Sequence, residues 1–327
     1  MLSRSAEGLY WTGRYLERTD HLCRLLRVQV ETLVDRPVRE IHFGWRRIYA
    51  SLGRLPPGAN VALGGADDDL TLADAYTLAD HLTFERTNPD SVRNGFSMAR
   101  ENARQMRHCI SAEFWTTFNL AWLRFKSRRI EEIWKTAPET FYTEVSRDID
   151  TLGGVAATTM YRDEGWRFLE LGRYTERAML MLALVLAHLA IWRRQAGESV
   201  RADDSWSSLL RVCQAVDAYR RRHGVEVRPA RVIDLLVNDP RLPRSLCHSF
   251  AMTVAELQAL PIGPGPMADA RRLASQMGTA LRNDWPAGSS LDAREACLRT
   301  LQARFLTFHG LVMAAYVGYD ADGAPVR

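Results

Sequence analysis

The sequence predicts an all-α protein, a helical bundle of two diverged repeat halves related by an approximate two-fold axis. Apolar residues recur at three- and four-residue spacing along most of the chain, as they do in amphipathic helices. The alternation typical of strands is nearly absent. The hexapeptide GRYLER at 13–18 returns as GRYTER at 172–177. We therefore expect a single domain over 1–327, with halves of about 1–160 and 161–327.

The composition is that of a folded protein with a complete core. Of the 327 residues, 46% are hydrophobic and 25% are charged, which argues against disorder. The net charge is +4 and no polybasic tail is present, so nucleic acid is not an expected partner. Lys126 and Lys135 are the only lysines in an otherwise Arg-based set of cations. This bias suits carboxylate or phosphate binding, although genomic base composition explains it more simply.

In the first half, helices are expected where the apolar stripe is continuous and Pro or Gly interrupts it. Pro37 ends the first helix and Gly53 ends the second. The acidic run at 67–69 favours a helix start, and Pro138 stands in a first turn, where its missing N–H costs nothing. The expected helices are 5–34, 38–52, 70–86, 89–110, 112–134 and 138–160.

The second half repeats this order and also begins with a long helix. Its stretch at 178–192, AMLMLALVLAHLAIW, is 15 residues long. A bilayer requires about 20 apolar residues, so we expect a central helix buried on all sides. The expected helices are 164–195, 206–222, 229–237, 243–260, 267–283 and 291–317.

The expected compartment is the cytoplasm, without membrane association. The N-terminus reads MLSRSAEG and lacks the apolar segment of a signal peptide. The five cysteines are widely spaced and form no CxxC motif. This pattern favours free thiols in a reducing compartment.

The repeated hexapeptide places two arginines and one glutamate on one face of each long helix, three and four residues apart. The same face becomes apolar further along, so the charged cluster should be partly buried. A buried charge must be paired or bound to a ligand. The residues are Arg14, Glu17 and Arg18 in the first copy and Arg173, Glu176 and Arg177 in the second.

These clusters have two interpretations, both of which remain open at this point. One is an ion-pair network that orients the two long helices, and the other is an anion-binding or catalytic site. If the halves pack about a two-fold axis, equivalent residues lie near that axis. We then expect cross-copy pairing, Glu17 with Arg177 and Glu176 with Arg18.

Two further groups are secondary candidates. Three arginines share one face of the helix expected at 89–110, where they would suit phosphate or carboxylate, or form a solvated face of mixed charge. A glutamate near the start of the helix at 164–195 is expected to cap it. The secondary candidates are Arg100, Glu101, Asn102, Arg104, Arg107 and Glu164.

No motif identifies a reaction. The sequence contains no HExxH, no GxSxG, no glycine-rich phosphate loop and no EF-hand pattern. His81 and Glu85 stand four residues apart on an expected helix, but two ligands are only a fragment of a metal site. No Glu-x-x-His pair supports a di-iron bundle. We expect neither a metal nor a cofactor.

Several strings besides the hexapeptides carry a family resemblance. They are MLSRSAEGLYWTGRYLER at the N-terminus, ARENAR at 99–104, SAEFWTTFN at 111–119, MYRDEGWRFLELGRYTER at 160–177 and DLLVNDPRLPRSL at 234–246. With them the chain resembles the alpha-E domain family, bacterial helical proteins named for a Glu-Arg motif, over nearly its whole length. By this resemblance the motif falls on Glu17-Arg18 and on Glu176-Arg177.

The resemblance implies a role beside other proteins. Family members are typically encoded next to, or fused to, circularly permuted ATP-grasp proteins, and transglutaminase-like or proteasome-related peptidases also occur nearby. This implies an accessory protein that acts with a separate ATP-grasp-type ligase in peptide or amide-bond formation or peptide tagging. It would hold an anionic group or a peptide on its Arg-rich helices. An alternative is an enzyme with Glu17 or Glu176 as general base and Arg as anion stabiliser, and a weaker one is a nucleic-acid-binding protein.

Overall fold

The computed structural model of the chain describes residues 3–57, 74–195, 202–261 and 265–316. Within these ranges every regular element is helical, which confirms the all-α class. The elements are α1 (Ser3–Asp35), α2 (Val38–Leu52), α3 (Ala75–Thr83), α4 (Val92–Gln105), the 3-10 helix η1 (Arg107–Cys109), α5 (Ala112–Lys126), α6 (Ile130–Trp134), α7 (Pro138–Thr159), α8 (Glu164–Gln195), α9 (Ala202–Val212), α10 (Val216–His223), α11 (Pro229–Asn238), α12 (Leu246–Ala259), α13 (Pro266–Asn283) and α14 (Leu291–Tyr316).

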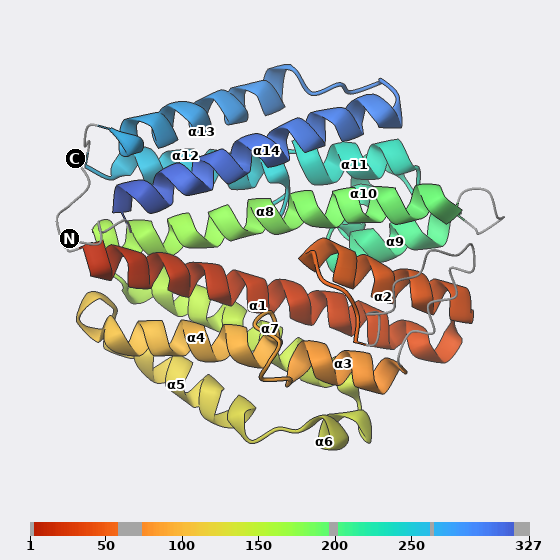
Figure 1. Cartoon of the computed structure of the whole chain (residues 1–327), viewed down its shortest axis with the longest axis horizontal. Coiled ribbons are helices and arrows are strands. Elements are labelled where there is room, and N and C mark those ends of the chain that lie inside the picture. Colours follow the sequence, from red (N-terminus) through yellow and green to blue (C-terminus); the bar gives the residue numbers. More distant parts are fainter. Residues whose placement is uncertain (1–2, 58–73, 196–201, 262–264, 317–327) are drawn as a thin grey trace.

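Two long helices, α1 and α8, lie side by side through the middle of the molecule (Figure 1). Helices α4 and α7 pack against α1 on one side of this pair, and α12 and α14 pack against α8 on the other. Helix α2 packs mainly against α8, and α9 contacts α1. The main core therefore follows the contact between α1 and α8, which are the first helices of the two expected halves.

The two central helices approach closely because a glycine lies on each side of their crossing. A Cβ on Gly13 would lie 2.1 Å from the carbonyl oxygen of Leu169. A Cβ on Gly172 would lie 2.0 Å from the carbonyl oxygen of Tyr10. Any side chain at either position would push the two backbones apart. The first residue of each hexapeptide is thus required by packing, and the contact is reciprocal.

The apolar stretch of α8 lies in the core, as the sequence predicted. Leu184, Val185 and Leu189 have no exposed surface. Among the described helices only α8 is long and apolar enough to cross a membrane, by length and composition, and 78% of its most apolar window is buried inside the molecule. A core helix passes the same test, so this feature is weak support for a membrane span.

Two of the expected helices are each broken in two. The helix expected at 112–134 is α5 and α6, and the break lets α6 turn and bury Ile130 and Ile133. The helix expected at 206–222 is α9 and α10, separated at Gln214, whose φ of 52° is left-handed. Helical periodicity continues across both breaks, so the apolar pattern alone did not reveal them.

Side-chain caps decide two other helix starts. Asp74 accepts a hydrogen bond from the first turn of α3, while the acidic run at 67–69 lies outside the described residues. Pro89 lies before α4, because the Ser91 hydroxyl caps that helix instead. Helix α4 ends at Gln105, earlier than predicted, and a 3-10 turn follows it.

Candidate functional site

The charged residues of the two hexapeptides meet at the crossing of α1 and α8. Arg177 donates two hydrogen bonds to the Glu17 carboxylate, from Nε at 2.8 Å and from Nη2 at 2.6 Å. Arg18 donates from Nε to Glu176 at 2.7 Å. Each glutamate is therefore paired with the arginine of the other copy, as expected from the sequence.

Glu176 lies on an enclosed side of the crossing. Arg14 donates from Nε to Glu176 at 2.5 Å, and the two side chains are only 3% and 1% exposed. His309 of α14 covers this pair, with its Nε2 2.9 Å from Nη1 of Arg14. The hydroxyl of Tyr10 lies 3.1 Å from Nδ1 of His309. Tyr10 of α1 and His309 of α14 thus cover the Glu176 side.

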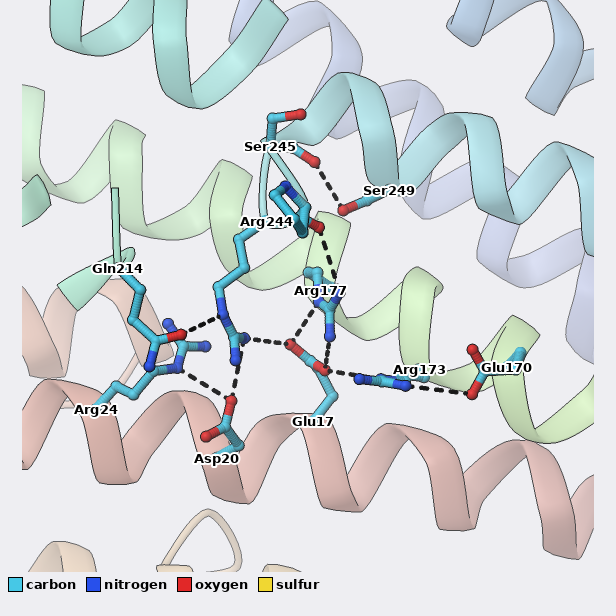
Figure 2. A network of polar contacts seen from close by, with 11 residues as sticks. Glu17, Asp20, Arg24, Glu170, Arg173, Arg177, Gln214, Arg244, Ser245 and Ser249 are labelled. Atoms are coloured by element: carbon cyan, nitrogen blue, oxygen red, sulfur yellow. Dashed lines mark hydrogen bonds and ion pairs between the residues drawn. The ribbon is translucent and has the colours of Figure 1, made fainter. Parts of the chain in front are cut away.

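Glu17 lies in a wider network of ion pairs, shown in Figure 2. Besides Arg177, it has Arg244 at 3.3 Å and Arg173 at 3.7 Å. Arg244 also reaches Asp20 at 3.1 Å, and Arg24 donates to the same carboxylate at 3.0 Å. The network therefore joins α1 and α8 to the segment that precedes α12.

The segment that connects α9 and α10 also contributes to this network. Gln214 accepts a hydrogen bond from Nε of Arg244 at 2.9 Å. Its left-handed backbone, which ended α9, is what places the amide there. Arg24 extends the same connection, because it donates to the backbone carbonyl of Val212 at 2.7 Å.

The surrounding arginines keep both glutamates ionised. Burial alone would raise the pKa of the Glu17 carboxyl, but Arg177, with Arg244 and Arg173, holds it well below the ordinary value. Burial opposes ionisation of Glu176 as well, and Arg14 and Arg18 lower its pKa. A general base at neutral pH needs a pKa near 7, so both carboxylates are poor bases.

A small cavity adjoins the Glu17 network. Its volume is about 30 Å³, and its walls come from α1, α5, α7 and α8 together with Arg244. Glu17, Asp20 and Asp150 contribute carboxylates to the wall, and Arg173 contributes a guanidinium. Burial, reinforced by Asp20, raises the pKa of Asp150. A cavity of this size has room for about two water molecules, or for one small polar group.

The arginine row expected along one helix face does not exist, because α4 ends before Arg107. Arg100 donates to the side-chain oxygen of Asn119 from Nε at 3.1 Å and from Nη2 at 2.7 Å. The guanidinium carbons of Arg100 and Arg107 lie 5.4 and 5.2 Å from the Trp115 ring. In the described part of the chain, neither arginine has a carboxylate partner within ion-pair distance.

The remaining secondary candidates have ordinary structural roles. Arg104 donates to Glu101 from Nε at 2.9 Å and from Nη2 at 2.7 Å, in an exposed pair. The side chain of Asn102 is half-buried on α4. Glu164 is the first residue of α8, but Asp163 accepts the capping hydrogen bond, from the N–H of Trp166 at 3.2 Å.

The possible metal pair is divided between other partners. Nδ1 of His81 lies 3.0 Å from the Tyr49 hydroxyl, and Glu85 accepts from the backbone and side chain of Thr87. Within the described ranges, no group of three or more His, Cys, Asp or Glu side chains is arranged to hold a metal ion.

Sequence analysis missed several residues of the site. Asp20 carried a usable signal, since it follows Glu17 by one helical turn. Arg244 stood within one of the family strings but carried no charge pattern of its own. His309 lies 295 residues from Arg14, and no local pattern connects them. Gln214 depended on a helix break that the periodicity did not reveal.

Comparison with known proteins gives a family but no function. The family model Alpha-E, described as a predicted alpha-helical domain with a conserved ER motif, matches residues 1–317. Uncharacterised proteins of Mycobacterium bovis and of two strains of Mycobacterium tuberculosis are each 27% identical over 307 residues. These matches cover 86% of this chain but 32% of each relative, so the chain spans about a third of their length. No solved structure matches the chain. Since the family match extends over nearly all of the sequence, this chain belongs to the Alpha-E family.

Proposed function

We propose that this chain is an accessory binding protein that acts with a separate ATP-grasp-type ligase in peptide or amide-bond formation or in peptide tagging. The observation that carries the proposal is the mutual neutralisation of the Glu-Arg pairs at the crossing of α1 and α8. Buried carboxylates that are held ionised by buried arginines orient helices, but they neither accept protons at neutral pH nor leave cations free for a substrate. The motif therefore favours a rigid frame over a catalytic centre.

The length of the relatives supports a role within a larger assembly. Each relative is about three times as long as its region of similarity to this chain. A helical unit that occurs inside longer proteins is expected to work in contact with the rest of them. For this chain we propose that a second polypeptide supplies the corresponding contact, and that a transglutaminase-like or proteasome-related peptidase is a further partner.

The proposed contact surface consists of Arg100, Arg107 and Trp115. The indole lies against both guanidinium groups, which orients them without neutralising their charge. Arg and Trp are the residue types that contribute most to binding at protein interfaces. A partner segment that bears carboxylates would complement this surface, and Arg can bind carboxylates through two parallel hydrogen bonds.

The test is affinity purification of the tagged chain from its native host, followed by mass spectrometry. We expect an ATP-grasp-type protein among the specific partners of the wild type. The double variant Arg100→Ala/Arg107→Ala should recover at least about tenfold less of it, because each interface hot spot contributes about 2 kcal/mol or more. Arg104→Ala is the matched control, since Arg104 is already paired with Glu101. Absence of any ATP-grasp-type partner from the wild type would contradict the proposal, and equal recovery by all variants would reject the surface.

We also infer that the two halves arose by duplication and pack about an approximate two-fold axis. Support comes from the reciprocal glycine contacts and the reciprocal Glu-Arg pairs. In the same way, α2 of the first half packs against α8 of the second, and α9 of the second half contacts α1 of the first. Superposition of residues 3–160 on 161–316 in an experimental structure would test the axis, and a rotation far from 180° would reject it.

A further inference from the structure

Arg47 of α2 is buried, and among the described residues it has no carboxylate partner. Its exposed fraction is 1%. Nη2 donates to the Ser208 hydroxyl of α9 at 3.2 Å, which is a contact with a neutral group. In the described part of the chain, Nε and Nη1 find no hydrogen-bond acceptor. The guanidinium therefore retains a full charge and unused donors inside the molecule.

Near Arg47 lie two more buried side chains whose polar atoms have no hydrogen-bond partner among the described residues. His188 of α8 has no exposed surface, and neither of its ring nitrogens is hydrogen-bonded to a described residue. Its ring lies 4.3 Å from that of Trp206, whose indole N–H is likewise without an acceptor there. The centroid of the Phe43 ring lies 5.3 Å from that of the His188 ring and 6.0 Å from the guanidinium carbon of Arg47. Helices α2, α8 and α9 thus bring together a cation and further N–H groups.

Other buried arginines in this protein show how unusual this arrangement is. Arg294 is 2% exposed and donates to both carboxylate oxygens of Asp234, at 2.8 and 2.7 Å. Arg24, at 4% exposure, is paired with Asp20. Burial lowers the pKa of Arg47 only to about 10, so the group stays charged at neutral pH. A buried charge of this kind is strongly destabilising unless an anion compensates it.

We propose that Arg47 anchors a buried oxyanion site between α2, α8 and α9, which binds a carboxylate or a phosphate group. Nε or Nη1 of Arg47, whose N–H groups point to different sides of the guanidinium, would donate to an oxygen of the anion. His188 is uncharged, because burial and the neighbouring Arg47 hold its pKa well below the ordinary value, and it can donate one N–H. Trp206 can donate another, and Phe43 excludes water. This site is separate from the Glu17 cavity, which is lined by α1, α5, α7 and α8. It goes beyond the proposed function.

The first test measures thermal unfolding in phosphate, in acetate and in chloride at equal ionic strength. For the wild type we expect phosphate or acetate to raise Tm above the chloride value by roughly 3–6 °C at saturation. The two anions distinguish a phosphate ligand from a carboxylate ligand. Arg47→Met replaces the cation by an apolar side chain of similar length, and its Tm should show only the smaller, general stabilisation that such salts give to any protein. An equal response of the wild type and Arg47→Met would overturn the proposal.

A second measurement uses the wild-type chain alone, so it does not depend on the folding of a variant. The side-chain Nε–Hε NMR signal of Arg47 should shift on titration with the anion that raises Tm. The matching signal of Arg294 is the internal control, because its carboxylate partner is already present. A shift of Arg47 alone supports the site. Signals that both stay unchanged, or that move together, would overturn it.

Discussion

Glu17 and Glu176 occupy equivalent places in the repeat, but their surroundings differ. Each accepts a hydrogen bond from the arginine of the other copy. Around Glu176 the protein is closed, with Arg14 beneath a cover formed by His309. Glu17 has two more arginine partners, Arg173 and Arg244, and a cavity beside it. The two hexapeptides thus supply the ion pairs, while the surrounding helices bury Arg14 and Glu176 and leave a small cavity beside Glu17.

This difference separates two roles within one motif. The Glu176 side stabilises the crossing of α1 and α8. The cavity side does the same, but it also holds Asp150 with a raised pKa next to polar space. Polar space next to the Glu-Arg centre is therefore found on the Glu17 side.

The largest effects on the free energy of unfolding should come from two single variants, each of which removes the carboxylate on one side. Glu176→Gln leaves Arg14 buried without a carboxylate, and we expect a loss of about 3–5 kcal/mol in the free energy of unfolding. Glu17→Gln leaves Arg177 in the same position, but water in the cavity can hydrate it. Its loss should be smaller by about 1 kcal/mol, the usual net value of a hydrogen bond. Urea denaturation measures both values, and equal losses would show that the cavity does not admit water.

A double-mutant cycle tests whether the pairs act as pairs. Glu17→Gln with Arg177→Met removes both charges, so the double variant should be more stable than the sum of the single effects predicts. We expect a coupling of about 1–3 kcal/mol. The same cycle on Glu176 and Arg18 should give less, because Arg18 is partly exposed and has Asp90 as a second partner at 3.3 Å. Additive losses would mean that the pairs contribute no specific interaction.

The two glycines should behave alike, in contrast to the two glutamates. Gly13→Ala and Gly172→Ala each place a Cβ against a backbone carbonyl, and each should cost about 1–3 kcal/mol. Gly154→Ala on α7 is the control, because no atom lies within 4 Å of its added Cβ. That change should stabilise the protein by about 0.5–1 kcal/mol. Chemical denaturation measures the loss in the free energy of unfolding for each variant. Clearly different losses for Gly13→Ala and Gly172→Ala would show that the two glycines do not contribute equally to the crossing.

The smallest expected effect is the pH dependence that His309 contributes on the Glu176 side. Burial, reinforced by Arg14, lowers the pKa of His309 to about 4. Between this value and the ordinary value of about 6.5 the unfolded chain binds a proton that the native protein does not, so stability falls as pH falls through this window. His309 is partly exposed, so we expect a contribution of about 1 kcal/mol.

The variant His309→Gln isolates this contribution. Its stability should change less than that of the wild type between pH 6.5 and pH 4, because Gln does not titrate. Denaturation curves at several pH values provide the measurement. Identical pH profiles for the two proteins would place His309 in solvent rather than against Arg14.

Local sequence patterns predicted the residues at the centre of the site but not those that surround it. The pairing of Glu17 with Arg177 followed from a repeat and from the cost of burying an unpaired charge. The helix breaks at Gln214 and before Ile130 did not follow, since tertiary contacts decide them against an unbroken apolar period. His309 and Arg244 could not be found for a related reason. They reach the centre through the packing of later helices, which no spacing within the hexapeptides encodes.

The reciprocal crossing has a consequence for how the chain folds. The ion pairs that define it join residues 158 and 160 positions apart in the sequence. During synthesis α1 leaves the ribosome long before α8, with its glycine face and its charged face both without their native partner. The first half therefore cannot complete its core until half of the chain has followed. Such distant contacts slow folding, because the loop must close before any contact rewards it. The central helix pair is thus expected to become native late, although α1 is made early.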